Sequence, residues 1–238
     1  MKLDVVFVAQ QGELEAMAAV LAASLRKFCE NQVFLHVIEP IPEQEYGRIS
    51  PETRRFLDDL GVQWYAFANP ISDEYKIFNK LNAFKIQPQG DRILFLDSDI
   101  LIRRSITPLL RYFTHAFAAR TAGAQRYSAR VSDWEPVYRL FNLEVPRVRW
   151  PAWGTYEWGP PYFNAGVILV DPELDFSTHW IDTCYQIHHA STVHLENPGT
   201  VQVGLPVVLY RQNIEFALLD GRFNFALNKW WGKLMKRH

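Results

Sequence analysis

The chain has 238 residues, of which 48% are hydrophobic and 21% are charged, and its formal net charge is −1. This length suits one substantial domain, and the near-neutral charge argues against nucleic acid as a partner. Two cysteines cannot form a disulfide framework and suit a reducing compartment, and no apolar run is long enough to span a bilayer. The first residues predict a strand rather than a signal peptide, so we expect a cytoplasmic location.

Strands and helices are predicted to alternate along the first half of the chain. Short apolar or β-branched runs predict strands at residues 3–9, 33–38, 62–67 and 93–96. Helical periodicity predicts a helix between each pair of consecutive strands. Such alternation predicts an α/β sandwich with a mainly parallel central sheet flanked by helices, in a single domain covering residues 1–238.

The apolar spacing also predicts which side of each helix is buried. The second helix is expected to begin at Ser50-Pro51, a capping serine followed by a first-turn proline. The third is expected from about Asp73 to Ile86. The expected buried positions are Leu14, Met17, Leu21, Leu25 and Phe28 in the first helix, Phe56, Leu57 and Leu60 in the second, and Ile77, Leu81 and Phe84 in the third.

The regular alternation weakens after residue 108. We expect a strand near 115–120, a polar loop at 121–132 and a short helix at 133–143, followed by an irregular stretch rich in tryptophan and proline. A buried strand is predicted from Tyr162 to Val170, and the helix after it should share one buried face. A further helix at 201–212 and a strand at 214–219 complete the expected elements.

The tripeptide Asp97-Ser98-Asp99 interrupts the apolar run at the end of the fourth predicted strand. Two carboxylates one residue apart in extended chain project from the same side and would repel each other beside apolar neighbours. Carboxylate oxygens suit Mg²⁺ or Mn²⁺, which would remove that repulsion. The alternative is that one aspartate caps a turn and the other faces water. Ligands of such sheets lie beyond the carboxyl ends of the strands, where the turn after residue 9 is also predicted.

Four segments, taken together, resemble the glycogenin and bacterial galactosyltransferase family of retaining nucleotide-sugar glycosyltransferases. In chain order they read N-K-L-N-A-F-K (79–85), R-I-L-F-L-D-S-D-I-L-I (92–102), Y-F-N-A-G-V-I-L-V-D (162–171) and L-D-G-R-F-N-F (219–225). The resemblance implies the Rossmann-like GT-A fold, with residues 1–110 binding nucleotide and metal and residues 111–238 binding the acceptor and the donor sugar.

The resemblance also implies roles in the first half of the chain. Asp97 and Asp99 would hold Mn²⁺ or Mg²⁺ against the diphosphate of a UDP-sugar donor, with Ser98 between them in the same nucleotide site. Ala9 and Gln10 would line the nucleotide. Lys80 would approach the phosphates or the donor sugar as a catalytic group; taken alone, a helical lysine is more often solvated.

In the second half, the resemblance implies that Asn164, Ala165 and Gly166 contact the donor sugar, with Asn164 also catalytic. Gln202 matches the family's glutamine beside the anomeric centre. The chain departs from the family at Val201, where an aspartate is usual, and at Pro206, where an asparagine is usual. The histidine block that supplies a third metal ligand is not visible, and His238 is the only histidine near the end.

The acceptor is expected to be a carbohydrate or a glycolipid, whose sugar rings could stack on Trp150, Trp153 or Trp158. These tryptophans could equally be core or lid residues. The basic end of the chain would permit weak contact with a membrane surface, or would simply be solvated. Neighbouring histidines at 188, 189 and 194 are interpreted as surface residues rather than a metal site. The sequence does not indicate an oligomeric state.

Two other functions remain open. A nucleotidyltransferase would share the architecture, but it would usually need a glycine-rich, basic loop after the first strand, and Gln10-Gln11-Gly12-Glu13 lacks both features. A degenerate transferase would bind sugar nucleotide or glycan without turnover, which Val201 and the missing histidine block would explain.

Overall fold

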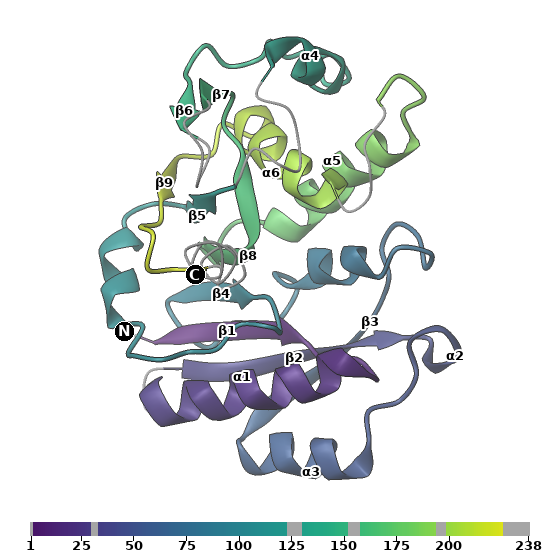
Figure 1. Ribbon diagram of the computed structural model, residues 1–238, viewed down its shortest axis with the longest axis vertical. Helices are drawn as coiled ribbons and strands as arrows, with labels where there is room; N and C mark the ends of the chain where they lie inside the picture. Colours follow the sequence, from purple (N-terminus) through teal and green to yellow (C-terminus); the bar gives the residue numbers. More distant parts are fainter. Residues whose placement is uncertain (1, 30–32, 123–129, 152–157, 194–198, 226–238) are drawn as a thin grey trace, which may run out of the picture.

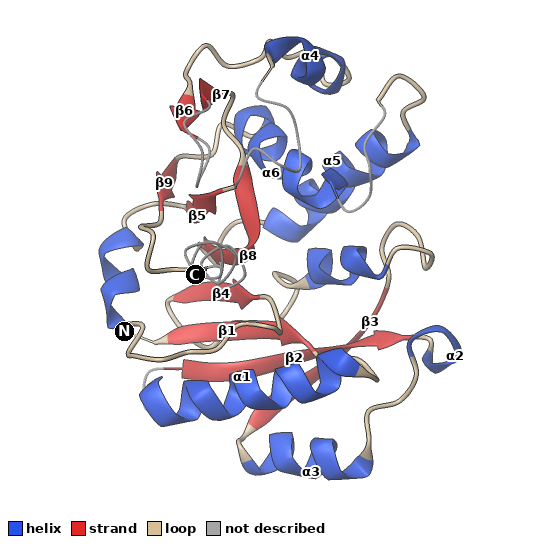
Figure 2. Cartoon of the chain, viewed as in Figure 1, coloured by secondary structure: helices blue, strands red, loops and turns tan. Residues whose placement is uncertain are grey.

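The computed structural model describes residues 2–29, 33–122, 130–151, 158–193 and 199–225. Within these ranges a central seven-stranded sheet is covered by helices (Figure 1 and Figure 2), as the alternation of elements predicts. The strands are β1 (Leu3–Val8), β2 (Val33–Ile41), β3 (Val62–Ala68), β4 (Arg92–Leu96), β5 (Phe117–Thr121), β8 (Phe163–Val170) and β9 (Phe216–Leu218). None of the helices in these ranges combines the length and apolar character needed to cross a membrane.

The order of the strands in the sheet is β3-β2-β1-β4-β8-β5-β9. Pairs β1–β2, β1–β4, β2–β3 and β5–β9 are parallel, whereas β8 is antiparallel to both of its neighbours, β4 and β5. Consequently β8 begins at the edge of the sheet where β1, β4 and β5 end. This edge therefore collects residues that follow three strands and residues that open a fourth.

Helices pack on both faces of the sheet. On one face lie α1 (Glu13–Cys29) and α3 (Pro51–Asp59), and on the other lie the 3₁₀ helix η1 (Lys76–Asn82), α5 (Phe176–His189) and α6 (Gly199–Arg211). The shorter elements are α2 (Glu43–Tyr46), η2 (Thr107–Tyr112), α4 (Val131–Arg139) and the two-stranded pair of β6 (Trp150–Pro151) and β7 (Trp158–Gly159).

Side chains of β1 alternate between two cores, as the period of a strand requires. Val5 and Phe7 pack with α1 and α3, while Val6 and Val8 pack with η1 and α5 on the opposite face. The central strands are buried on both faces for this reason, which accounts for their continuous apolar sequences.

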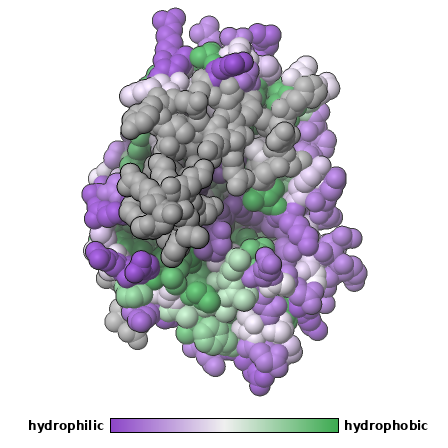
Figure 3. Space-filling model, viewed as in Figure 1, coloured by the Kyte–Doolittle hydropathy of each residue, from purple (hydrophilic) through white to green (hydrophobic). Residues whose placement is uncertain are grey.

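The apolar spacing placed the buried face of α1 incorrectly at its ends. Leu21 and Leu25 are fully buried as predicted, but Leu14, Met17 and Phe28 are partly exposed. Small residues such as Ala18 fill the interface instead, so that the helix lies close to the sheet. Figure 3 shows hydrophobic surface in the part of the molecule where α1 lies.

Two other predictions about helices are also wrong. Phe56 in α3 is 43% exposed, and only Leu57 is fully buried. The helix expected at 73–86 is the shorter 3₁₀ helix η1, followed by a turn. Ser177 of α5 holds the end of this segment: the backbone N–H of Phe84 donates to Ser177 Oγ at 3.1 Å, and that hydroxyl donates to the carbonyl of Leu81 at 2.7 Å.

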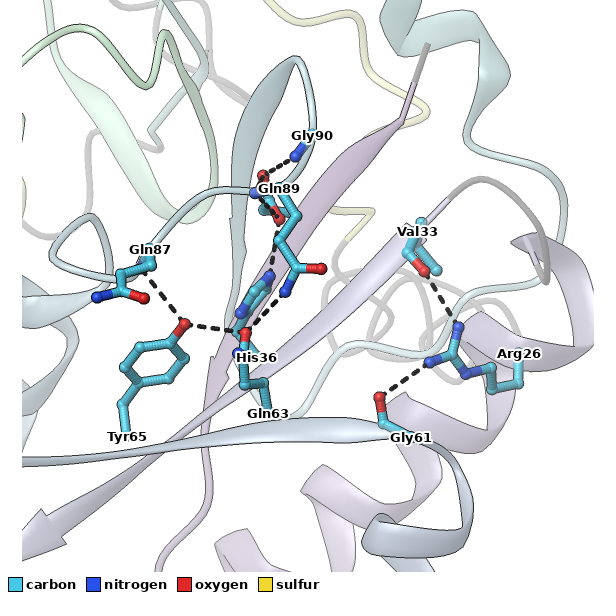
Figure 4. Close-up of polar contacts among 10 residues, drawn as sticks. Arg26, Val33, His36, Gly61, Gln63, Tyr65, Gln87, Gln89 and Gly90 are labelled. Atoms are coloured by element: carbon cyan, nitrogen blue, oxygen red, sulfur yellow. Dashed lines mark hydrogen bonds and ion pairs between the residues drawn. The ribbon is translucent and has the colours of Figure 1, made fainter.

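A buried polar network fixes the loop that leads into β4. Asp4 and His36 are fully buried, and His36 Nε2 lies 2.8 Å from Asp4 Oδ1. The carboxylate of Asp4 also accepts from the backbone N–H groups of Gln89, at 3.0 Å, and Gly90, at 2.7 Å. Figure 4 shows His36, Gln89 and Gly90 converging there. Because these bonds precede β4 directly, they hold the register that places Asp97 at the far end of the strand.

Candidate active site

The candidate site lies at the edge of the sheet where β1 and β4 end and β8 begins. The backbone N–H of Asp97 donates to the carbonyl of Gly166 at 2.8 Å, which joins the end of β4 to the start of β8. The hydroxyl of Ser98 donates to the carbonyl of Val8, which joins the same turn to the end of β1. Ser98 is buried by this contact, so its hydroxyl has a structural bond within the chain.

Lys80 reaches this edge from η1. Its side chain is buried, with the residue only 8% exposed, and its ammonium group donates to Asp97 Oδ1. The same group lies 5.4 Å from the centre of the Phe95 ring. Burial excludes the solvated lysine that the sequence alone left open. A buried ammonium needs a charged partner, and Asp97 supplies it.

Asp99 is the exposed member of the acidic pair. Partial burial of its carboxyl group and the neighbouring charge of Asp97 raise its pKa, while Lys80 acts in the opposite direction. Both causes disfavour the charged form of Asp99, and a bound cation would favour it.

The carboxylates of Asp97 and Asp99 are oxygen ligands of the kind that Mg²⁺ and Mn²⁺ prefer. Within the described ranges, no group of three histidine, cysteine, aspartate or glutamate side chains could hold a metal ion. His238 lies outside those ranges. The residues therefore fit a cation that takes two protein carboxylates and completes its shell with water and phosphate oxygens, as Mg²⁺ often does.

Three polar side chains approach the backbone of Gly166 closely, because this residue has no side chain of its own. A Cβ atom at this position would lie 2.8 Å from Asp97 Oδ2, 2.8 Å from Asn224 Nδ2 and 3.0 Å from Asn164 Oδ1. The glycine is thus required by close approach of side chains, and its backbone conformation is ordinary. Asn164, which the resemblance placed at the donor sugar, lies beside Asp97 at this point.

Ala9, Gln10 and Ala165 also lie at this edge, and all three are buried. The side chains of Ala9 and Ala165 belong to the two cores, so only their backbone atoms can face a ligand. The geometry brings these residues together with the acidic pair, while their roles toward a nucleotide stay predictions.

Gln202 is held by Tyr162, the residue just before β8. The Tyr162 hydroxyl donates to Gln202 Oε1 at 2.8 Å. Tyr162 and Asn164 are two residues apart in extended chain, so their side chains lie on the same side. Val201, which replaces the aspartate usual in the resembled family, is 1% exposed and packs in the core of the second face.

Sequence reasoning assigned no role to Asn224 and Arg120. Asn224 donates to Asn164 Oδ1 at 2.5 Å, and its carbonyl accepts from the guanidinium of Arg120. Burial lowers the pKa of Arg120. The available signal is the segment L-D-G-R-F-N-F, which contains Asn224 and is one of the four segments that carry the family resemblance.

The aromatic and histidine candidates separate into several environments. Trp150 packs edge-on against Phe163 and Phe216 in the core, and Trp158 is 62% exposed. His188 is half-buried against Tyr75 and Phe78 rather than on the surface as expected, whereas His189 is exposed. Trp153, His194 and the basic end of the chain lie outside the described residues.

A mainly parallel sheet with one reversed strand, followed on β4 by an acidic pair, is the architecture of GT-A glycosyltransferases. Solved structures with this fold match nearly the whole chain. The galactosyltransferase LgtC, in complex with donor and acceptor sugar analogues, shares 21% identity at a TM-score of 0.57, over 99% of this chain and 79% of LgtC. Mouse xyloside xylosyltransferase 1 shares 17% identity at a TM-score of 0.56, over 98% of this chain and 89% of the xylosyltransferase. The glycosyltransferase GlyE of Streptococcus pneumoniae TIGR4 shares 17% identity at a TM-score of 0.55, over 100% of this chain and 50% of GlyE.

The family model of the Rhodobacterales glycosyltransferase domain matches residues 5–213, and the chain belongs to this family. It is therefore an enzyme of the glycosyltransferase class with the GT-A fold. No curated protein sequence matches it significantly.

Proposed function

We propose that this glycosyltransferase moves a sugar from a UDP-sugar to a hydroxyl group of a glycan, glycolipid or other acceptor, with a divalent cation at Asp97 and Asp99 and with retention at the anomeric carbon. One observation carries the proposal: the ammonium of Lys80 and the side chain of Asn164 lie with Asp97 at one edge of the sheet, around the backbone of Gly166. The division of residues 1–110 for nucleotide and 111–238 for sugars is part of this proposal.

The chemistry follows from where charge develops. The bond between the anomeric carbon and the β-phosphate oxygen breaks, and the leaving diphosphate gains negative charge. A cation bound by Asp97 and Asp99 would supply positive charge at that diphosphate. Lys80 adds a second, fixed positive charge, because its contact with Asp97 holds it at the same edge. The acceptor oxygen bonds to the anomeric carbon on the face that the diphosphate leaves, and its proton passes to the departing diphosphate, so the protein need not supply an acid.

Gln202 would face the anomeric carbon as it becomes oxocarbenium-like. Its carbonyl oxygen has two lone pairs, and the Tyr162 hydroxyl uses one of them. The second lone pair remains to stabilise positive charge on the sugar. An active-site glutamine was also the residue replaced, by glutamate, in a solved LgtC variant.

The acceptor site is proposed at the exposed indole of Trp158, because sugar rings stack on flat aromatic faces. A cytoplasmic location also belongs to the proposal. The two cysteines support it, since both are buried and free.

The first test is calorimetric titration of UDP into the protein, with Mn²⁺ and with EDTA. Binding should require Mn²⁺ and should weaken by about tenfold or more in Asp99→Asn, the effect of losing one charged ligand contact. Asp59→Asn, which alters an exposed aspartate of α3, is the matched control and should bind as the wild type does. Failure of UDP to bind in any condition would contradict the proposal.

Turnover separates the proposal from a degenerate transferase, which the buried Val201 favours. UDP-galactose and UDP-glucose should be hydrolysed slowly or transferred, and NMR of the first-formed sugar should show the α-anomer if retention holds. Metal-dependent binding without any release of UDP would support the degenerate alternative. A nucleotidyltransferase finds no support in the family assignment.

A further inference from the structure

Asn224 approaches the candidate site from the segment after β9, 60 positions beyond Asn164 in the chain. Its backbone is left-handed, with φ of 62°, a conformation that favours glycine but that asparagine tolerates. Arg120, which is buried, donates to the carbonyl of Asn224 and so holds this segment against the end of β5. The backbone would accept glycine here, so the Asn224 side chain can be removed without straining the chain.

The contacts fix which atom of each amide is which. A backbone N–H can only donate, and the N–H of Gly166 lies 2.7 Å from the Asn164 side chain, so that atom is the oxygen Oδ1. Asn224 lies 2.5 Å from the same oxygen and must therefore present its NH₂ group. The Asn164 oxygen thus accepts from both Gly166 and Asn224, which satisfies its two lone pairs.

The remaining group of Asn164 is its NH₂. Among the residues that the structure describes, this group has no hydrogen-bond partner, and it belongs to a side chain beside Asp97. Because its oxygen accepts two hydrogen bonds, the Asn164 carboxamide cannot rotate without losing both of them. Its NH₂ is therefore held as a donor, ready for an acceptor oxygen such as a sugar hydroxyl.

We propose that Asn224 is a positioning residue, which holds the Asn164 carboxamide so that its NH₂ donates to an oxygen of the donor sugar. The inference rests on the proposed function, because it assigns that task within the donor site. In this arrangement Asn164 can only donate to a ligand, because its oxygen already accepts two bonds within the chain. A ligand group that can only donate would therefore be rejected at this point.

The test compares affinities for UDP and for UDP-galactose or UDP-glucose, by calorimetry with Mn²⁺, in variants of Asn164 and Asn224. Asn164→Asp keeps oxygens for Gly166 and Asn224 but loses the donor, so it should lower the affinity for the UDP-sugar by about tenfold relative to UDP. Asn224→Gly keeps the left-handed backbone and removes the side chain, and should cause a smaller loss of the same kind.

Asn224→Asp separates positioning from space filling. It preserves shape but turns an oxygen toward Asn164 Oδ1, so it should impair UDP-sugar binding more than Asn224→Gly does. A side chain that merely fills space would give the opposite order. Asn213→Gly, at an exposed left-handed asparagine between α6 and β9, is the matched control and should leave both affinities unchanged.

Two further measurements complete the test. Combining Asn164→Asp with Asn224→Gly should cost no more than Asn164→Asp alone, since both act on one donor; additive losses would overturn the proposal. In ligand-free protein, NMR should show slow exchange of the Gly166 N–H and of one Asn224 carboxamide proton. Fast exchange would contradict the hydrogen bonds of Asn164 to Gly166 and Asn224. Failure of the wild type to bind UDP would contradict the proposed function, and the NMR result would then still decide whether Asn224 bonds to Asn164.

Discussion

Lys80 of η1 donates to Asp97, which follows β4, although the two residues are 17 positions apart in the chain. The ammonium is buried, whereas the carboxylate side chain is 35% exposed. The pair therefore has one buried side, the Lys80 ammonium, and one partly exposed side, the Asp97 carboxylate. A buried cation fixed in this way cancels part of the charge of the acidic pair before any ligand arrives.

Replacing Lys80 by methionine should destabilise the fold, because Asp97 loses its charged partner while the side-chain volume is kept. We expect a loss of about 1–3 kcal/mol in the free energy of unfolding, measured with urea. Mn²⁺ should restore part of this loss, since it takes over the neutralisation. Lys76→Met, at an exposed lysine of the same helix, is the control; equal effects of the two variants would contradict the role of the ion pair.

Asp99→Asn should stabilise the ligand-free protein at pH 7. The pKa of Asp99 is raised above its ordinary value of 3.8, so the folded state binds this proton more tightly than the unfolded state does. Ionised Asp99 therefore costs stability at neutral pH, and the cost disappears as the pH falls toward 3.8. The gain should stay below about 1 kcal/mol because an exposed charge is screened.

Urea unfolding of wild type and Asp99→Asn at pH 7 and pH 4 checks this prediction. The difference between the two proteins should shrink at the lower pH. A gain of the same size at both pH values would show that the charge is not its cause.

Tyr162→Phe removes the donor that holds Gln202. Under the proposed function, donor hydrolysis should slow by about tenfold, the effect of one lost hydrogen bond in the transition state, with the affinity for UDP unchanged. Steady-state release of UDP measures the rate and calorimetry the affinity. Unchanged hydrolysis would mean that Tyr162 does not orient Gln202 for the reaction.

Replacing Tyr138 by phenylalanine should stabilise the folded protein. The Tyr138 hydroxyl is buried and has no hydrogen-bond partner among the described residues, so its removal relieves a desolvation cost. We expect the free energy of unfolding to rise by about 1 kcal/mol. A loss of stability would indicate that a buried water satisfies this hydroxyl.

Gly166→Ala should distort the site, because the new Cβ would lie 2.8 Å from both Asp97 Oδ2 and Asn224 Nδ2. We expect a cost of about 1–3 kcal/mol in stability and a loss of UDP-sugar binding. Gly221→Ala is the control, since a Cβ there would meet no atom within 4 Å. Thermal unfolding and calorimetry of both variants decide the outcome.

Restoring the aspartate of the resembled family at Val201 should unfold the protein rather than improve it. Val201 is 1% exposed among apolar side chains, so the carboxylate would be buried without a partner. Val201→Asp should cost several kcal/mol at pH 7, more than the neutral, isosteric Val201→Asn, and the two should converge at low pH. A gain in transfer activity in Val201→Asp would contradict the view that position 201 belongs to the apolar core.

The sequence allowed the sheet and its acidic edge to be predicted because both depend on local patterns. Short apolar or β-branched runs predicted β1 to β4, and Asp-x-Asp after an apolar strand predicted the position of the candidate site. Lys80 and Asn164 required the family resemblance, since a lysine and an asparagine carry little information alone. Burial of Lys80 then decided between the two interpretations of that residue.

The remaining features depend on contacts between distant segments. Periodicity does not reveal that β8 is reversed, because a buried strand reads the same in either direction. Ser177 of α5 bonds to the end of η1 and the turn after it, and Asn224 bonds to Asn164; neither contact follows from the local sequence. Phe56 was misplaced because its spacing fits a buried stripe that the sheet does not reach.

The order of strands has a consequence for the growing chain. Strands β1 to β4 pair with one another and can assemble while the rest of the chain is still being synthesised, but the outer edge of β4 pairs with β8, whose first residue is Phe163. About 65 residues must therefore leave the ribosome, at roughly 5–20 residues per second, while a strand that is apolar from Ile93 to Leu96 keeps one open edge. Slow codons or a translational pause in this interval would lengthen the time during which that edge can pair with another nascent chain.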